Sequence, residues 1–437
     1  MSPLERLDDV PALLESKSVP GLTLAYITDD DADPVTHVWG VASTADDRPV
    51  TTDTVFRAGS VSKPVTAFAA LRLAADGHLD LDADVNTLLH SWRLPAVEGW
   101  QPVVTTRMLL AHVAGTSGWG DSAGYDDTEP PASLVDVLEG RGDMPALTFH
   151  ALPNVMWLYS SGGYLVVQLV ITDVMGVPFP EAIRKLVFQP LGMTSSTFEA
   201  PLPDRWRAVA ADGHLDGRAV PAPPIKDPAM ADGGMWTTPS DLMLLARAIN
   251  TNAVPEMLVG HPVERRMGLG LFLNDYHGVR WWSHDGSVPG FECHLGGAAE
   301  TGFAVAAMTN APEGASVAGE VAGLLGALYG PGRPAIRPLT WDGIAAAIRM
   351  NNHNLKAVGT YRLPGGGEVV LTAAPPDKWG QQGIELTLPG QPTIPLAWPV
   401  TDGRWRVPGF ETMVIFDPPD GLRFLHGGQE VRAERVR

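Results

Sequence analysis

Phe56-Arg-Ala-Gly-Ser60-Val-Ser-Lys63-Pro64 places a serine three residues before a lysine, where an Ala- and Leu-rich run to Ala75 begins. This composition predicts a helix that ends near Gly77, because glycine commonly follows the last helical residue. Side chains three apart share one helix face, so the Lys63 ammonium is expected to reach the Ser60 hydroxyl. A lysine with a lowered pKa can take the proton of a serine and make it a nucleophile. Ser-x-x-Lys alone is common, and the rest of the chain has to support this interpretation.

Length and charge limit the possible classes of function. At 437 residues, the chain exceeds one ordinary core, which favours one large domain and one small one. The formal net charge of -19 disfavours nucleic acid and anionic membrane surfaces as partners. The first residues lack the basic and apolar segments of a signal peptide, and no apolar run is long enough to span a membrane. We therefore expect a cytoplasmic protein with no membrane partner.

A single cysteine, Cys293, excludes an intrachain disulfide and a multi-cysteine zinc site. It lies in an apolar, strand-like run, where a buried core thiol is the favoured interpretation. His112, His284 and His294 do not have the spacing of metal ligands, so no metal and no cofactor is expected.

Strand-like runs near both ends of the first 330 residues suggest the architecture. They lie at 22–27, 36–41, 279–284, 290–295 and 302–309, and helical pieces dominate from 78 to 260. This order predicts an α+β fold: an antiparallel sheet flanked by helices, with an inserted helical lobe. A helix is expected over 316–328.

The last hundred residues change in character. A Pro- and Gly-rich stretch over 330–338 resembles a linker, and a short helix is expected near 341–350. Short β-prone runs then alternate with turns, at 368–372, 384–388, 413–416 and 422–425, which predicts a small C-terminal β-barrel or a meander. The expected domains are 1–335, the catalytic domain, and 336–437, the small barrel.

A second candidate segment is Tyr159-Ser160-Ser161, which precedes an apolar helical stretch from Leu165 to Val174. A tyrosine at a helix N-terminus has its pKa lowered by the helix dipole and by nearby cations. Such a phenol can carry a proton between nucleophile and leaving group. Taken alone, a tyrosine packed on a loop is the more common situation.

A third segment, Ser283-His284-Asp285-Gly286-Ser287, lies at the end of a strand-like run. Gly286 permits close approach of a substrate to the backbone. The Ser287 N–H can pair with the Ser60 N–H as an oxyanion hole, and His284 can orient the substrate or assist it electrostatically.

The three segments, in this order, resemble those of the serine β-lactamase-like and penicillin-binding-protein superfamily, in its class C β-lactamase, D-aminopeptidase and family VIII esterase branch. Further matching segments begin at Leu109, Phe188, Gly233 and Gly268, and the resemblance covers roughly residues 10 to 330. It implies a β-lactamase/transpeptidase-like fold. It also implies that Ser60 is acylated, that Lys63 and Tyr159 handle protons, and that Gly286 and Ser287 line the substrate strand.

Two departures from the family pattern matter. The family's Tyr-x-Asn is Tyr-Ser-Ser here, so Ser161 lacks the amide that contacts substrate. His284 stands where class C β-lactamases have lysine, which disfavours β-lactam hydrolysis. His112 and the pair Gly233 and Gly234 are interpreted as structural, although the glycine loop can border the site.

The C-terminal part resembles the lipocalin-like barrel of penicillin-binding-protein-type thioesterases, which cyclise nonribosomal peptides. Arg432, Arg435 and Arg437 could contact a substrate carboxylate there, but a solvated basic tail is favoured.

The expected function is two-step acyl transfer through Ser60, acting on an ester, thioester or amide of a small-molecule or peptide substrate. Water can resolve the acyl-enzyme, or an amine can do so, as in peptide cyclisation or transacylation for natural-product assembly. A catalytically inactive relative that only binds ligands is the third alternative. The sequence leaves the oligomeric state open.

Overall fold

The computed structural model describes two regions of the chain. The larger region comprises residues 6–96, 101–116, 133–141, 145–149, 153, 157–220, 228–276 and 278–330. In the C-terminal region, the described segments are 358–362, 368–373, 384–387, 394–396, 404–406, 413–417, 421–426 and 429–436. The expected helix at 341–350, the boundary at residue 335 and Arg437 lie outside the described residues.

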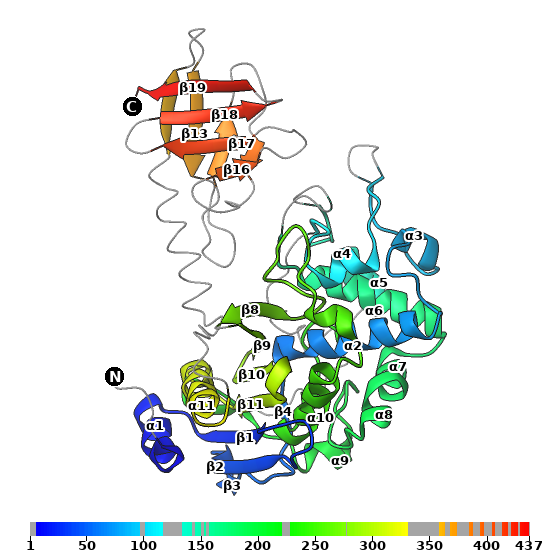
Figure 1. Cartoon of the computed structure of the whole chain (residues 1–437), viewed down its shortest axis with the longest axis vertical. Coiled ribbons are helices and arrows are strands. Elements are labelled where there is room, and N and C mark those ends of the chain that lie inside the picture. Colours follow the sequence, from blue (N-terminus) through cyan, green and yellow to red (C-terminus); the bar gives the residue numbers. More distant parts are fainter. Residues whose placement is uncertain are drawn as a thin grey trace.

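A seven-stranded antiparallel sheet forms the centre of the larger region, with strand order β3-β2-β1-β11-β10-β9-β8 (Figure 1). The N-terminal strands therefore pair with strands from near residue 300, as the distribution of strand-like runs predicted. The strands are β1 (Gly21–Ile27), β2 (Val35–Ser43), β3 (Arg48–Pro49), β8 (Phe272–Tyr276), β9 (Val279–Val288), β10 (Phe291–Ala298) and β11 (Phe303–Thr309).

Helices pack against both faces of this sheet because the strands are apolar on both faces. All residues of β1, β10 and β11 are buried. One face packs against α1 (Val10–Lys17) and α11 (Gly314–Leu328), and the opposite face packs against α10 (Pro239–Asn250). The expected mixture of helices and antiparallel sheet is thus confirmed.

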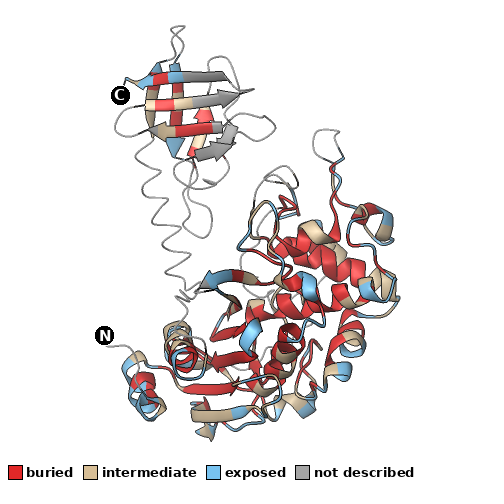
Figure 2. Cartoon of the chain, viewed as in Figure 1, coloured by how far each residue is buried: buried red, intermediate tan, exposed pale blue. Residues whose placement is uncertain are grey.

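Most of the other helices lie in the chain between β3 and β8. The two long ones, α2 (Ser62–Ala75) and α6 (Ser161–Met175), are buried along most of their length (Figure 2). The inserted helical lobe stays a prediction. The shorter helices are α3 (Val85–Leu88), α4 (Thr106–Leu110), α5 (Leu134–Leu138), α7 (Phe179–Ile183), α8 (Gln189–Leu191) and α9 (Asp204–Arg207).

Two small strand pairs complete the larger region. One joins β4 (Phe56–Arg57) to β7 (Trp236–Thr237), and the other joins β5 (Gly213–Leu215) to β6 (Arg218–Val220). The first pair matters for the site, because it ties the chain just before Ser60 to the segment that follows Gly234.

Helix α6 begins earlier than its apolar stretch suggested, at Ser161 rather than near Leu165. Ser160 is the N-cap, and its hydroxyl accepts a hydrogen bond from the Gly163 N–H at 2.9 Å. The cap compensates for the low helix propensity of Gly162 and Gly163 in the first turn. Tyr159 consequently lies one residue before the N-cap.

In the described part of the chain, no single helix is long and apolar enough to cross a membrane. The helices Ser161–Met175 and Phe179–Leu191, bent by 76°, meet that criterion only as a pair.

The C-terminal region is one antiparallel sheet of eight strands with the order β15-β14-β13-β12-β19-β18-β17-β16. It curls into a half-barrel, so the prediction of a closed β-barrel is wrong. The first strand pairs with the last, which places three-residue strands at the two edges, and among the described residues of this region these edges do not pair with each other. The strands are β12 (Gly359–Arg362), β13 (Glu368–Ala373), β14 (Ile384–Thr387), β15 (Ile394–Leu396), β16 (Arg404–Arg406), β17 (Met413–Asp417), β18 (Gly421–His426) and β19 (Gln429–Arg435).

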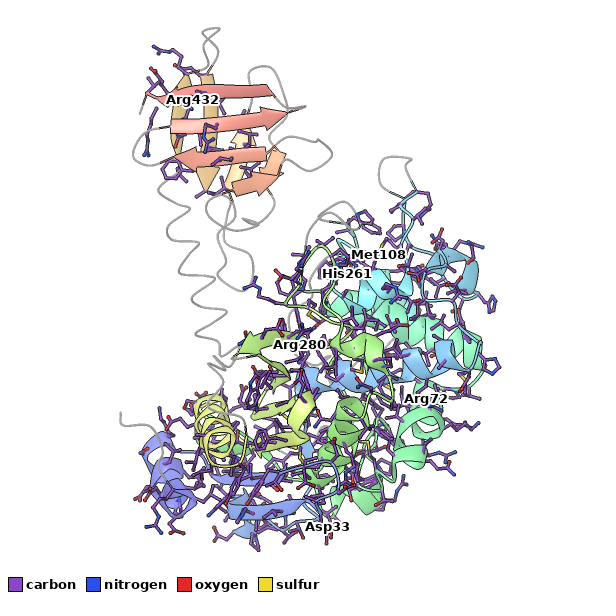
Figure 3. All side chains as sticks on the ribbon, viewed as in Figure 1. Asp33, Arg72, Met108, His261, Arg280 and Arg432 are labelled. Atoms are coloured by element: carbon purple, nitrogen blue, oxygen red, sulfur yellow. The ribbon has the colours of Figure 1, made fainter. Side chains whose placement is uncertain are left out.

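The basic residues of β19 have different surroundings. Arg432 is exposed on this sheet (Figure 3), whereas the Arg435 guanidinium donates to the Val358 carbonyl oxygen at 2.7 Å and lies 5.9 Å from the centre of the Tyr361 ring. Arg435 is therefore engaged by its own sheet.

Candidate active site

Ser60 and Lys63 come together where the main sheet meets the first long helix. Ser60 lies in the short 3-10 turn Gly59–Val61, and Lys63 is the second residue of α2. The Lys63 Nζ donates to Ser60 Oγ at 3.0 Å and to the Asp232 carbonyl oxygen at 2.8 Å. The Lys63 side chain is 0% exposed. A fully buried lysine beside a half-buried serine is an arrangement suited to proton exchange between the two.

Two aromatic rings surround the lysine. Its Nζ lies 5.0 Å from the centre of the Tyr159 ring and 5.7 Å from that of Tyr164. Ring faces attract a cation and partly offset the loss of hydration on burial. The Tyr164 hydroxyl donates to the Leu110 carbonyl oxygen at 2.9 Å, and burial raises the pKa of Tyr164 well above its usual value. Tyr164 is therefore a neutral neighbour of Lys63 whose hydroxyl proton is engaged by the main chain.

His112 positions Tyr159, which the sequence did not indicate. The Leu158 N–H donates to the His112 carbonyl oxygen at 2.8 Å, and the Ser160 N–H donates to His112 Nδ1 at 3.1 Å. The imidazole also stacks on the Tyr159 ring, with ring centres 4.3 Å apart. The residues on both sides of Tyr159 are therefore bound to one histidine. His112 also adopts a positive φ of 56°, which is rare for a residue other than glycine and is not visible in the sequence.

The His112 imidazole is neutral. Burial, and then the positive charge of Lys63, lower the pKa of His112 well below its usual value. Because Nδ1 accepts a hydrogen bond, the ring proton resides on Nε2. A neutral ring adds no second positive charge beside Lys63.

His284 lies on β9 and is 2% exposed. Its Nδ1 is 2.6 Å from the Asp285 carbonyl oxygen, which can only accept, so Nδ1 carries the proton. The unprotonated Nε2 is buried and has no hydrogen-bond partner among the described residues. The ring centre lies 6.3 Å from that of Tyr159 and 5.3 Å from that of Phe272. The site therefore contains a buried acceptor atom available for a donor on a ligand.

Burial and the nearby Lys63 charge lower the pKa of His284 to about 4. At neutral pH, His284 is uncharged. Of the two roles expected for it, orientation of a substrate by hydrogen bonding fits this state, whereas assistance by a positive charge does not.

Gly286 and Ser287 lie against the turn that carries Ser60. Strand β8 pairs with β9 only as far as Ser283, so beyond that residue the edge of β9 is open to the turn. A Cβ on Gly286 would overlap the Ala58 carbonyl oxygen and lie 3.0 Å from Ser60 N. A Cβ on Gly59, which has a φ of +52°, would lie 2.7 Å from Ser287 N. Glycine is required at both positions, because the turn that carries Ser60 and the strand segment of Gly286 and Ser287 lie in close contact.

The side chain of Ser287 points away from this contact. Residues alternate between the faces of a strand, so Ser287 and Asp285 lie opposite to His284 and Gly286. The Ser287 hydroxyl donates to Glu292 Oε1 at 2.7 Å, and Asp285 Oδ1 is 2.6 Å from His294 Nδ1. These cross-strand pairs connect β9 to β10 behind the site. Ser287 can contribute its N–H to the site, and its hydroxyl is engaged behind the strand.

Asp232 is a neighbour of Lys63 that sequence reasoning missed, and its main-chain carbonyl oxygen accepts from Lys63 Nζ at 2.8 Å. Ser161 is the first residue of α6 and is 8% exposed. Burial raises the pKa of Asp232, while the positive charge of Lys63 and the Ser161 hydroxyl oppose this rise. The only hint in the sequence was an acidic residue directly before Gly233 and Gly234.

Cys293 is buried on β10, as expected, and burial raises the pKa of its thiol well above the usual value. Within the described ranges, no group of three or more histidine, cysteine, aspartate or glutamate side chains could hold a metal ion.

The arrangement can be compared with known proteins. Residues 8–329 match the family described as beta-lactamase. The chain is 30% identical over 261 residues to esterase EstB of Burkholderia gladioli, and this match covers 53% of the chain and 66%, just under two thirds, of the esterase. It is 28% identical over 334 residues to penicillin-binding protein 4 of Amycolatopsis lactamdurans, which covers 70% of the chain and 84% of that protein.

Among solved structures, that of SurE with D-Leu resembles this chain with a TM-score of 0.61 and 25% sequence identity. The likeness covers 98% of this chain and 97% of SurE. It therefore includes the C-terminal sheet as well as the region that carries Ser60.

Proposed function

Because this chain belongs to the beta-lactamase family, we propose that it is a serine acyl-enzyme hydrolase that acts on an ester or amide substrate. The observation that carries the proposal is the 3.0 Å hydrogen bond between the fully buried Lys63 Nζ and the half-buried Ser60 Oγ. The names of two relatives, an esterase and a penicillin-binding protein, support the same reaction class.

The first step joins Ser60 Oγ to the carbonyl carbon of the substrate. The hydroxyl proton passes to Lys63 in its amine form or to the phenolate of Tyr159, whose ring lies beside the lysine. The same group then returns the proton to the departing alcohol or amine as the bond between carbonyl carbon and leaving group breaks. Water resolves the acyl-enzyme in the second step, with the same groups accepting and returning a proton.

The negative charge of the tetrahedral intermediate requires preorganised donors. The N–H groups of Ser60 and Ser287 are the proposed oxyanion hole, supported by the close approach of Gly59 and Gly286. Loss of one such donor typically slows catalysis by about 10²–10³-fold. His284 accepts a hydrogen bond from the substrate through its unprotonated Nε2.

Transfer of the acyl group to an amine is the second candidate, for peptide cyclisation or transacylation in natural-product assembly. The likeness of the whole chain to a solved structure that holds D-Leu favours an acyl donor or acceptor built from amino acids. The two reactions share the same acyl-enzyme and differ in the second nucleophile. An amine titrated into the reaction distinguishes them, because only transfer yields the amide product in proportion to the amine.

Mass spectrometry after incubation with a fluorophosphonate tests the proposed nucleophile. We expect one covalent adduct on Ser60 and none in Ser60→Ala. An adduct that persists in Ser60→Ala would exclude Ser60 as the nucleophile. A wild-type protein that forms no adduct and cleaves no ester or amide would instead support the third alternative, a relative that only binds ligands.

A further inference from the structure

Gln168 is the one polar side chain in an otherwise apolar stretch of α6. From Leu165 to Ile171 the other residues are leucine, valine and isoleucine, and every residue of the stretch is buried. A buried amide group is costly unless its oxygen and its nitrogen both find partners. Gln168 is 4% exposed, and both ends of its amide group are paired. The residue therefore makes contacts here that an apolar side chain could not make.

The partners of this amide group all belong to one segment beside the active site. Gln168 Oε1 accepts from the N–H groups of Met230 and Ala231, each at 2.9 Å. Gln168 Nε2 donates to the Pro228 carbonyl oxygen at 2.7 Å. Two N–H donors and one carbonyl acceptor fix which end of the amide is the oxygen. One side chain thus joins three main-chain groups, all just before Asp232, to α6.

A tight turn follows these contacts and presents the Asp232 carbonyl oxygen to Lys63. The N–H groups of Gly233 and Gly234 both donate to the Met230 carbonyl oxygen, at 3.3 and 2.8 Å, which closes the turn around Asp232. The Asp232 carbonyl oxygen accepts from Lys63 Nζ at 2.8 Å. A shift of Met230 would therefore pass through a single turn to the hydrogen bond of the lysine.

The same segment is also bonded to α2, the helix that carries the lysine. The Thr66 hydroxyl donates to the Ala231 carbonyl oxygen at 3.0 Å, and the Met235 N–H donates to Ser62 Oγ at 3.0 Å. The segment is thus held between the two long helices, and the carbonyl oxygen that contacts the lysine is preorganised.

The carbonyl partner decides which way the lysine amine can face. A neutral amine has two N–H groups and one lone pair, and a carbonyl oxygen can only accept. One N–H of Lys63 is therefore committed to Asp232, which leaves the lone pair able to face Ser60 Oγ, 3.0 Å away. Removal of the hydroxyl proton needs this orientation, because the base must lie within hydrogen-bond reach of the proton that it takes.

We propose that Gln168 is a positioning residue for acylation: it fixes the Asp232 carbonyl oxygen and, through it, the Lys63 amine. It acts through the main chain and not through contact with the substrate. The inference rests on the proposed function, since it takes Lys63 as the group that receives the serine proton.

The rate of labelling by a fluorophosphonate tests the proposal on the full chain. In this reaction, Ser60 Oγ forms a bond to phosphorus, fluoride leaves, and the hydroxyl proton passes to the lysine. Saturation kinetics separate the maximal labelling rate from the probe concentration that gives half of it. Gln168→Met keeps an unbranched side chain and removes all three hydrogen bonds. We expect the maximal rate to fall by about 10–10²-fold, as for a small displacement of a catalytic group, with the half-saturating concentration unchanged.

Asn86→Leu is the matched control. Asn86 is another buried side-chain amide, 8% exposed, and its Oδ1 accepts from the Leu94 N–H at 2.9 Å. It belongs to α3, which lies at the edge of the larger region and away from β9 (Figure 1). Both variants should lower the urea midpoint of unfolding, and only Gln168→Met should slow labelling. Equal slowing in the two variants, or a wild-type rate in Gln168→Met, overturns the proposal.

A second comparison asks whether Gln168 acts through Lys63. In the Lys63→Ala background, Gln168→Met should change the residual labelling rate by less than about twofold, because two substitutions that remove the same interaction are not additive. If Gln168→Met slows labelling by the same factor with and without the lysine, the glutamine acts by another route and the proposal is wrong.

Thr66→Val carries the same test if Gln168→Met does not fold, because it loosens the same segment from α2 with a side chain of similar shape. Its expected loss of rate is smaller, about two- to tenfold, and should again vanish in Lys63→Ala. In that case a wild-type rate in Thr66→Val overturns the proposal. If the wild type forms no adduct, or if the adduct persists in Ser60→Ala, the proposed nucleophile fails and the inference fails with it.

Discussion

The pocket around Lys63 and the ion-pair cluster around Arg107 hold positive charges in opposite ways. Arg107, on α4, is partly exposed and bonds to Asp82 at 2.8 and 2.9 Å and to Glu256 at 2.6 Å. Lys63 is fully buried, and its ammonium donates hydrogen bonds to a hydroxyl and a main-chain carbonyl oxygen. Carboxylates hold the Arg107 proton firmly and raise the pKa of that guanidinium. The proposed proton exchange between Lys63 and Ser60 uses this direct contact with a hydroxyl, which Arg107 lacks among the described residues.

Substitution of the two cations gives the largest expected contrast. Lys63→Ala should slow acylation by roughly 10²–10⁴-fold, the usual contribution of a positioned acid–base group. Arg107→Ala should leave acylation close to wild type and lower the free energy of unfolding by about 1 kcal/mol, because the pair is partly solvated.

Stopped-flow acylation with an activated ester measures the first effect, and urea denaturation measures the second. Equal acylation rates in Lys63→Ala and the wild type would remove the lysine from its role. A large loss of rate in Arg107→Ala would contradict the division into a reactive and a structural cation.

A substitution at Gly286 tests the geometry of the pocket without changing its charges. An added Cβ would overlap the Ala58 carbonyl oxygen and press on Ser60 N, so Gly286→Ala should displace the oxyanion donors. We expect kcat/KM to fall by about 10²–10³-fold, as for the loss of one donor.

The matched control is Gly323→Ala in α11, where an added Cβ meets nothing within 4 Å. This change should leave the rate constant unaltered and slightly stabilise the helix. If both variants keep the wild-type rate, the close contact of β9 with the Ser60 turn is not needed for catalysis.

The buried Lys63 charge and burial itself disfavour a second positive charge on His284, so the free energy of unfolding depends on pH. The pKa of His284 is lowered from 6.5 to about 4, so the unfolded chain binds a proton that the folded chain does not bind between these values. The free energy of unfolding should therefore fall as the pH decreases from about 6.5 to about 4, by roughly 3 kcal/mol for this residue.

Denaturation curves of the wild type and His284→Asn at pH 7 and pH 5 measure the difference. The variant should show a weaker dependence on pH, and NMR titration of Lys63→Met should show a His284 pKa that has risen. An unchanged pKa in Lys63→Met would mean that burial alone keeps His284 neutral.

The sequence predicted the parts of the site that depend on neighbours along the chain. Ser60 and Lys63 meet because they are three residues apart at a helix start, and Tyr159 stands before α6 as expected. The positions of Asp232 and His112 in the site were not predicted. Asp232 is 169 residues from Lys63, and its contact with Lys63 depends on how the segment after Pro228 packs on α2. No local pattern encodes such a contact.

The same distinction applies to the fold. Alternation and turn residues indicated nine of the nineteen strands among the described residues, including β13 and β14, but the barrel was wrong, since closure depends on whether the edge strands pair. By itself, the sequence determined the Ser-x-x-Lys turn, the strand-forming segments and the order of the three motifs, because backbone geometry and side-chain type act over a few residues. Only the tertiary structure decided that His284 is neutral, that the Asp232 carbonyl oxygen accepts from Lys63 and that β9 opens to Ser60 beyond Ser283, because burial and long-range packing set these properties.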